Sequence, residues 1–264
     1  MPVSMQALAD DLATESAQLR ALLAPLTEDD WRRDTPAEGW TIADQVSHLA
    51  HFDDVAVRSA TDPDAFRADL ERITAEGGID PDTVAASYRD LSGAALLSWF
   101  DDARGRLVEV FRALDPALRV PWFGPALSAA SSLTARIMET WAHGQDVADA
   151  LGVTREPSPR LRHVAHIGVG ARAFSFAAHG RPAPAEPVRV ELAAPGGGTW
   201  TWGPDDAADR VTGPAQDFCL AVTQRRHRDD VGLVVTGPAA TAWMEIAQAF
   251  AGAPGTGRAR GAHR

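Results

Sequence analysis

The chain has 264 residues, of which 45% are hydrophobic and 23% charged, an ordinary composition for a globular protein with a sizeable core. Its formal net charge of −11 at pH 7 repels phosphate backbones and anionic lipid headgroups, so we expect neither a nucleic-acid nor a membrane partner. A single cysteine excludes an intrachain disulfide.

The N-terminus shows no sign of a targeting segment. Met1 to Gln6 has no basic stretch followed by an apolar core, and no window of about 18 consecutive apolar residues follows. We therefore expect a cytoplasmic protein. The one cysteine, Cys219, lies in an apolar run, which favours a small buried residue over a reactive thiol.

The chain up to about residue 180 has the pattern of helices. Leucines recur at helical spacing near the N-terminus until Pro25 ends the run. Thr41 is the expected N-cap of a second helix, and Pro81 is the first-turn proline of a third, with a break near Gly105. Gly152 is the expected stop of the fourth. The five predicted helices span about 8–24, 41–61, 81–114, 128–151 and 159–179.

From Arg181 the sequence changes character. Pro182, Pro184 and Pro187 follow closely, as expected of a linker. Two stretches that alternate in the strand manner then flank a run of three glycines and predict a hairpin. The predicted elements here are strands at 188–192, 199–202 and 209–212 and helices at about 213–224 and 238–250.

These elements predict a mainly α fold with a helical bundle followed by a small α+β domain. The expected domains are the bundle over 1–180 and the small domain over 187–251. The glycine-rich, basic tail over 252–264 is expected to be disordered.

A glutamate and a histidine on one helix face suggest a metal site. Glu139 and His143 stand four residues apart in the fourth predicted helix, so their side chains can converge on one point. Apolar neighbours surround the pair, and an uncompensated carboxylate there would cost several kcal/mol unless a cation offset it. His48, midway along the second predicted helix, is the second imidazole. A surface pair between Glu139 and His143 is the plain alternative.

Two imidazoles and one carboxylate would leave coordination positions open to water or substrate, which is the pattern of a catalytic zinc site. We therefore expect one divalent metal at His48, Glu139 and His143, with zinc favoured. Iron(II) and nickel(II) also suit these ligands, and the sequence does not decide between the three ions.

Trp40 to Leu49, followed much later by Met138 to Asp146, resembles the DinB-like metal-binding four-helix-bundle superfamily, most closely its branch that contains mycothiol-dependent maleylpyruvate isomerase. In that branch a histidine of the second helix and a later Glu-x-x-x-His pair bind the metal. His48, Glu139 and His143 occupy those motif positions. The resemblance covers nearly the whole chain, and it implies that a sterol-carrier-like domain follows the bundle over 187–251.

The resemblance implies a metal-dependent isomerase or transferase. A small thiol such as mycothiol would add to an activated unsaturated acid or enone, and this thiol must come from outside because Cys219 is a poor candidate. Two other functions stay open. One is thiol-independent Lewis-acid chemistry by a lyase, cyclase or hydrolase, and the other is a non-enzymatic carrier of small molecules or lipids.

Further side chains are candidates for the substrate pocket. Arg136, one turn before Glu139, could hold an anionic substrate or make a surface pair. Trp122 and Phe123, in an irregular connection, could wall a pocket or pack in the core.

The resemblance also implies that an arginine of the small domain reaches the active site. Arg225 or Arg226 could do so, although cations at the end of a helix are favourable in any case.

Three more residues could assist the metal ligands. Asp44 and Asp146, each within one helical turn of a ligand histidine, could orient its imidazole. A solvated carboxylate is the favoured alternative for both. His51 could be a fourth ligand or an acid–base group, although a packed or exposed histidine is favoured.

Overall fold

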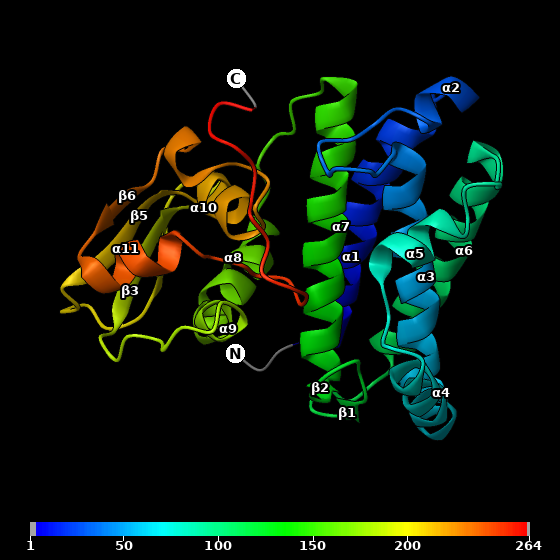
Figure 1. Cartoon of the computed structure of the whole chain (residues 1–264), viewed down its shortest axis with the longest axis horizontal. Helices are drawn as coiled ribbons and strands as arrows, with labels where there is room; N and C mark the ends of the chain where they lie inside the picture. Colours follow the sequence, from blue (N-terminus) through cyan, green and yellow to red (C-terminus); the bar gives the residue numbers. More distant parts are fainter. Residues whose placement is uncertain (1–3, 263–264) are drawn as a thin grey trace. The chain divides into compact units, whose positions relative to one another are not determined.

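The computed structural model describes residues 4–262 and divides into two compact units, Met1–Arg155 and Glu156–Arg264 (Figure 1). The boundary lies earlier than the one expected after residue 180. Helices α8 (Leu161–Gly170) and α9 (Arg172–Ala178) account for the difference. They pack against α10 (Ala215–Val222) and α11 (Pro238–Met244) of the second unit rather than belonging to the bundle.

The first unit is a bundle of four long helices, α1 (Met5–Leu23), α3 (Ile42–Thr61), α6 (Gly93–Arg112) and α7 (Ala129–Leu151). Both α1 and α3 pack against α6 and α7, so the four helices enclose a shared interior that holds two clusters of buried apolar side chains (Figure 1). Apolar side chains from every helix fill it, among them Leu12, Leu19, Ile42, Leu49, Phe100, Leu107, Leu133 and Ile137. The predicted mainly α fold with a helical N-terminal bundle is confirmed.

Shorter elements join the long helices. They are α2 (Glu28–Trp31), α4 (Pro63–Ala75), α5 (Pro81–Ala86), β1 (Arg119–Val120) and β2 (Leu127–Ser128). Helix α4 was not predicted, although its start carries a clear signal. The Asp62 carboxylate accepts a hydrogen bond from the Ala65 amide, and Pro63 occupies the first turn, where its missing N–H costs nothing.

The break expected near Gly105 is wrong. The chain breaks between α5 and α6, at residues 87–92, and Gly105 lies inside α6. The Ser92 side chain caps α6, and the Glu28 carboxylate accepts a hydrogen bond from the Gly93 amide. Contacts with the segment around α2 therefore fix where α6 begins, and local sequence does not show such contacts.

The second unit contains a four-stranded sheet in the order β4-β3-β5-β6. Its strands are β3 (Val188–Ala193), β4 (Thr199–Trp202), β5 (Asp209–Pro214) and β6 (Val234–Thr236). The predicted hairpin is the antiparallel β3–β4 pair, while β5 lies parallel to β3 and antiparallel to β6. The small α+β domain is confirmed, and β6 is the strand that sequence analysis missed.

Two helices of this unit differ from the prediction. The helix expected over 159–179 is interrupted at Ala171, and the last helix ends at Met244 rather than near residue 250. In the expected disordered tail, residues 252–262 contain no helix or strand, but the Gly255 and Gly261 amides donate hydrogen bonds to Gln248 and Asp230. Residues 263–264 lie outside the described part of the chain. No helix of the described residues is both long and apolar enough to cross a membrane.

Two glycines of α6 test what fixes its start. A Cβ at Gly93 would lie 2.3 Å from the Trp31 indole, whereas a Cβ at Gly105 would have nothing within 4 Å. We expect Gly93→Ala to destabilise the protein by about 1–3 kcal/mol through this overlap. Gly105→Ala should be neutral or stabilise by up to about 1 kcal/mol, because alanine favours a helix. Denaturant unfolding measures both, and equal effects would contradict the role given to Gly93.

Candidate metal centre

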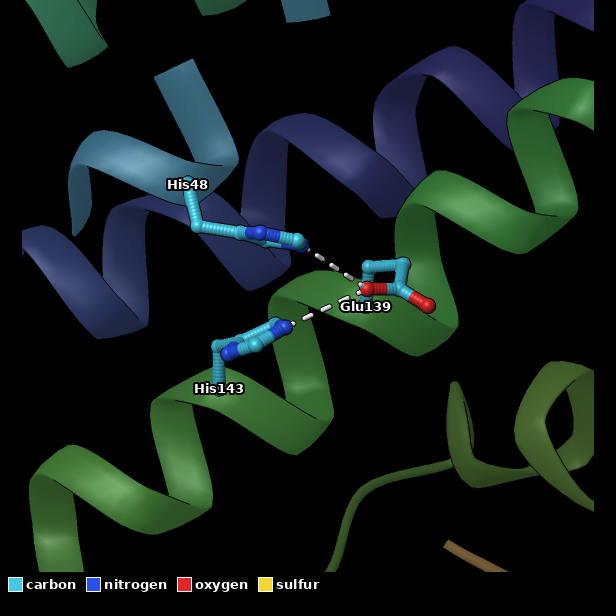
Figure 2. Close-up of side chains that lie close together, drawn as sticks. All are labelled: His48, Glu139 and His143. Carbon is cyan, nitrogen blue, oxygen red and sulfur yellow. Dashed lines mark hydrogen bonds and ion pairs between the residues drawn. The ribbon is translucent and has the colours of Figure 1, made fainter. Parts of the chain in front are cut away.

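Helices α3 and α7 lie side by side in the bundle and bring three distant residues together. His48 comes from α3, and Glu139 and His143 come from successive turns of α7. Figure 2 shows both imidazole rings directed at the Glu139 carboxylate. The start of α3 is fixed by the predicted cap. The Thr41 hydroxyl accepts from the Asp44 amide, and the Asp44 carboxylate accepts from the Thr41 amide.

The spacing of the three side chains fits a single metal ion. Nε2 of His143 lies 3.2 Å and Nε2 of His48 lies 3.6 Å from Oε2 of Glu139, and one ligand atom from each residue lies within 4.8 Å of the others. Tetrahedral zinc with bonds of about 2.0–2.1 Å separates its ligand atoms by roughly 3.3 Å. The side chains of His48 and His143 are each 11% exposed and that of Glu139 is 19% exposed, so the carboxylate is the more accessible side of the site.

A buried glutamine contacts the ring nitrogen of His143 that lies away from Glu139. Oε1 of Gln45 lies 2.5 Å from Nδ1 of His143, and Nε2 of Gln45 donates to the Thr35 hydroxyl at 2.9 Å. That hydroxyl in turn donates to the Trp40 carbonyl at 2.8 Å. Gln45 was not among the residues predicted from the sequence. Gln45 lies one turn before His48 in the sequence, but this spacing does not show that its side chain reaches His143. That contact depends on how α3 packs on α7.

This contact has a consequence for Nε2 of the same ring. When Nδ1 donates to Gln45, a neutral His143 turns the lone pair of Nε2 toward the Glu139 carboxylate. Two acceptors 3.2 Å apart repel each other unless a proton or a cation lies between them. A metal ion bound to both atoms would remove that repulsion. This is a second reason why these residues suit a metal ion.

Arg136 lies beside Glu139 and is not a surface residue. It is 6% exposed, with its guanidinium 3.8 Å from the Glu139 carboxylate and 3.7 Å from that of Asp53. Asp53 also pairs with the buried Arg104 at 2.6 Å. The surface pair considered for Arg136 is therefore wrong, and its role in binding an anionic substrate stays a prediction.

The surroundings set the protonation of two of the ligands. Burial, followed by the nearby His143, lowers the pKa of His48 to about 4, and Glu139 only partly opposes the change. Burial alone would raise the pKa of Glu139, but the contacts with the His143 and His48 side chains and the charge of Arg136 hold it well below its usual range. A neutral imidazole and an ionised carboxylate are the forms that bind a metal.

The predicted aromatic residues contact Phe52, whose ring lies beside that of His48. Trp122 stacks on Phe66 with the ring centres 6.3 Å apart, and Phe123 meets Phe52 edge to face at 6.0 Å. The Phe52 ring is 4.7 Å from that of His48. Trp122 and Phe123 are partly exposed, so core packing and a pocket wall both remain compatible with their place.

The other candidates near the ligands have partners of their own. His51 shares a hydrogen bond of 3.0 Å with the Tyr88 hydroxyl and is not part of the ligand cluster. Asp44 is buried and binds Arg89 besides capping α3, so the solvated carboxylate expected for it is wrong. Asp146 is fully buried rather than solvated.

Arg225 and Arg226 follow α10 in the second unit. Each donates to a nearby backbone carbonyl, that of Thr223 for Arg225 and that of Arg225 for Arg226. Their role at an active site stays a prediction. Cys219 of α10 is fully buried, as expected, and burial raises the pKa of its thiol.

Comparisons with known proteins show which proteins the chain is similar to in sequence and in fold. Residues 12–148 match the family model described as the mycothiol maleylpyruvate isomerase N-terminal domain, and residues 184–236 match the one described as wyosine base formation. Two uncharacterized proteins of Mycobacterium tuberculosis, MT0041 of strain CDC 1551 / Oshkosh and Rv0036c of strain ATCC 25618 / H37Rv, are each 49% identical over 94% of this chain and 96% of their own length.

Among solved structures, the mycothiol-dependent maleylpyruvate isomerase is similar, with a TM-score of 0.59 and 16% identity over 89% of this chain and 97% of that one. A variant of that enzyme with one histidine replaced by alanine matches equally well. At this identity the likeness shows the fold alone. None of these matches bears on the sterol-carrier likeness expected for the small domain, which stays a prediction.

The low pKa of His48 predicts how the metal-free protein responds to acid. The unfolded chain protonates this histidine near pH 6.5, whereas the folded protein does so only near pH 4. Between these values the unfolded state binds more protons, so stability falls as the pH drops, by about 3 kcal/mol over the window for this group. Denaturant unfolding of chelator-treated protein at several pH values should show a shallower fall for His48→Gln. Parallel curves would contradict the assignment.

Proposed function

This chain belongs to the mycothiol maleylpyruvate isomerase N-terminal domain family, and we propose that it is a metal-dependent isomerase or transferase that uses a small thiol as cosubstrate. The observation that carries the proposal is the cluster of His48, Glu139 and His143, whose ligand atoms lie within 4.8 Å of one another. Three protein ligands leave room for an exchangeable fourth, which is the arrangement of a catalytic rather than a structural site.

His48, Glu139 and His143 would hold the ion, and zinc suits their two nitrogens and one oxygen. When bound, a divalent metal supplies a Lewis acid that brings the pKa of a coordinated thiol or water toward neutrality. Glu139 would contribute its negative charge, kept ionised by Arg136, and the two imidazoles would contribute neutral nitrogens. Trp122 and Phe123 would form the apolar wall beside His48.

The proposed substrate is a small activated unsaturated acid or enone. The external thiolate adds to one carbon of the double bond, which becomes a single bond as its electron pair moves onto the adjacent carbonyl oxygen. The single bond rotates, the electron pair returns, and the carbon–sulfur bond breaks to release the thiolate and the isomer. Arg136, Arg225 and Arg226 are the proposed candidates for contact with a substrate carboxylate.

The thiol must come from outside the chain. The sequence contains one cysteine, Cys219, and its side chain is fully buried with its pKa raised by burial. A buried, protonated thiol is a poor nucleophile. A low-molecular-weight thiol would supply the sulfur. Mycothiol is one such thiol, and the similar solved enzyme is named as mycothiol-dependent.

Metal content tests the ligand set. We expect the purified protein to hold about one equivalent of divalent metal, most of it lost in His48→Ala, because removing one of three ligands weakens the site directly. Elemental analysis of dialysed protein measures this.

His51→Ala is the matched control, because His51 lies one turn away on α3 and binds Tyr88 instead. It should keep the metal of the wild type. Equal metal in all three proteins, or none in the wild type, would refute the ligand assignment.

Turnover with and without thiol tests the reaction class. With maleylpyruvate as the first substrate, we expect isomerisation only when mycothiol is added, and Cys219→Ala should retain that rate because the buried thiol takes no part. The change in the absorption spectrum of the substrate follows the reaction. Turnover that needs metal but no thiol would replace this proposal with thiol-independent Lewis-acid chemistry.

A further inference from the structure

Gln45 is fully buried in α3 and contacts Nδ1 of His143, at the edge of the ring away from Glu139. From this geometry we infer that Gln45 is a positioning residue that fixes the tautomer of His143, so that Nε2 presents its lone pair to the metal. The inference rests on the proposed metal site and adds a residue to its machinery.

The direction of the hydrogen bonds follows from a backbone carbonyl, which can only accept. The Trp40 carbonyl accepts from the Thr35 hydroxyl, so the oxygen of that hydroxyl is free to accept from the Gln45 amide nitrogen. The Gln45 carbonyl is thereby turned toward Nδ1 of His143, which must then carry the proton. A chain of three hydrogen bonds therefore joins the backbone of residue 40 to a ligand imidazole.

The reverse orientation of the amide predicts the opposite tautomer. It would point the Gln45 nitrogen at Nδ1, move the ring proton to Nε2 and turn the Thr35 hydroxyl away from the Trp40 carbonyl. Nε2 would then have no lone pair for a metal. The observed placement of Oε1 2.5 Å from Nδ1 and Nε2 2.9 Å from the Thr35 hydroxyl favours the arrangement that can bind metal.

The contact between Gln45 and His143 is buried, so water does not compete for it. Gln45 and Thr35 are 0% and 8% exposed, so bulk water does not replace the glutamine if it is removed. The Trp40 ring, whose backbone carbonyl begins the chain of hydrogen bonds, stacks on His143 with the ring centres 5.8 Å apart and covers that side of the imidazole. Partners that fix a ligand histidine in this way typically change metal affinity by about 10–100-fold.

The test compares Gln45→Met, which keeps the length of the side chain and loses the acceptor, with Gln45→Glu, which keeps an acceptor. Chelator competition with zinc measures the dissociation constant, and ¹⁵N spectra of histidine-labelled protein report which ring nitrogen of His143 carries the proton. We expect Gln45→Met to bind zinc about 10–100-fold more weakly and to lose the protected Nδ1 proton. Gln45→Glu should retain both properties.

Gln145→Met is the matched control for the loss of a buried amide, because Gln145 is also buried in the bundle and its amide donates to Asp149. It should bind zinc as the wild type does. Thr35→Val gives a second route if Gln45→Met does not fold, since it removes the hydroxyl that orients the glutamine, and it should weaken zinc binding in the same direction.

Undiminished zinc affinity in Gln45→Met, or in Thr35→Val where that variant stands in for it, would overturn the inference. So would a proton on Nε2 of His143 in the wild type. A wild type that binds zinc but shows no thiol-dependent turnover refutes the proposed function alone. If the wild type bound no zinc, the ¹⁵N spectrum of the metal-free protein would still decide the tautomer, with a proton on Nδ1 supporting the role of Gln45.

Discussion

Buried charges of alternating sign run through the centre of the bundle and end at the candidate metal centre. Arg104 pairs with Asp53 at 2.6 Å, Asp53 approaches Arg136 at 3.7 Å, and Arg136 approaches Glu139 at 3.8 Å. A buried charge without a partner costs several kcal/mol, so each member of the row depends on its neighbours. Glu139 is the last charge in this row. The two imidazoles face its carboxylate, and a metal ion bound between them would be the next positive charge.

This row explains why a partly buried carboxylate can remain ionised inside a helical bundle. The contacts with His143 and His48 and the charge of Arg136 outweigh the effect of burial on the pKa of Glu139. The same burial keeps His48 neutral. One low-dielectric environment therefore has opposite effects on the charge of two neighbouring ligands, and both leave the ligand in the form that a metal requires.

The ligands of the site stand on helices whose ends are fixed by local contacts. The capping box of Thr41 and Asp44 fixes the start of α3, and Gly152, with φ of +68°, ends α7. Such supports hold ligands more precisely than loops do. The reaction depends on the small molecules that reach the site from solution, since the one cysteine of the chain is buried.

The sequence by itself determined what depends on local spacing. Helical periodicity placed Glu139 and His143 on one face, proline and glycine signals marked most helix ends, and the resemblance to a family supported His48 as the third ligand. The tertiary structure decided the rest, including the hydrogen bond of Gln45 to His143, the burial of Arg136 and the break before α6. These features depend on how one helix is rotated and shifted against another, and that is set by side chains far apart in the sequence.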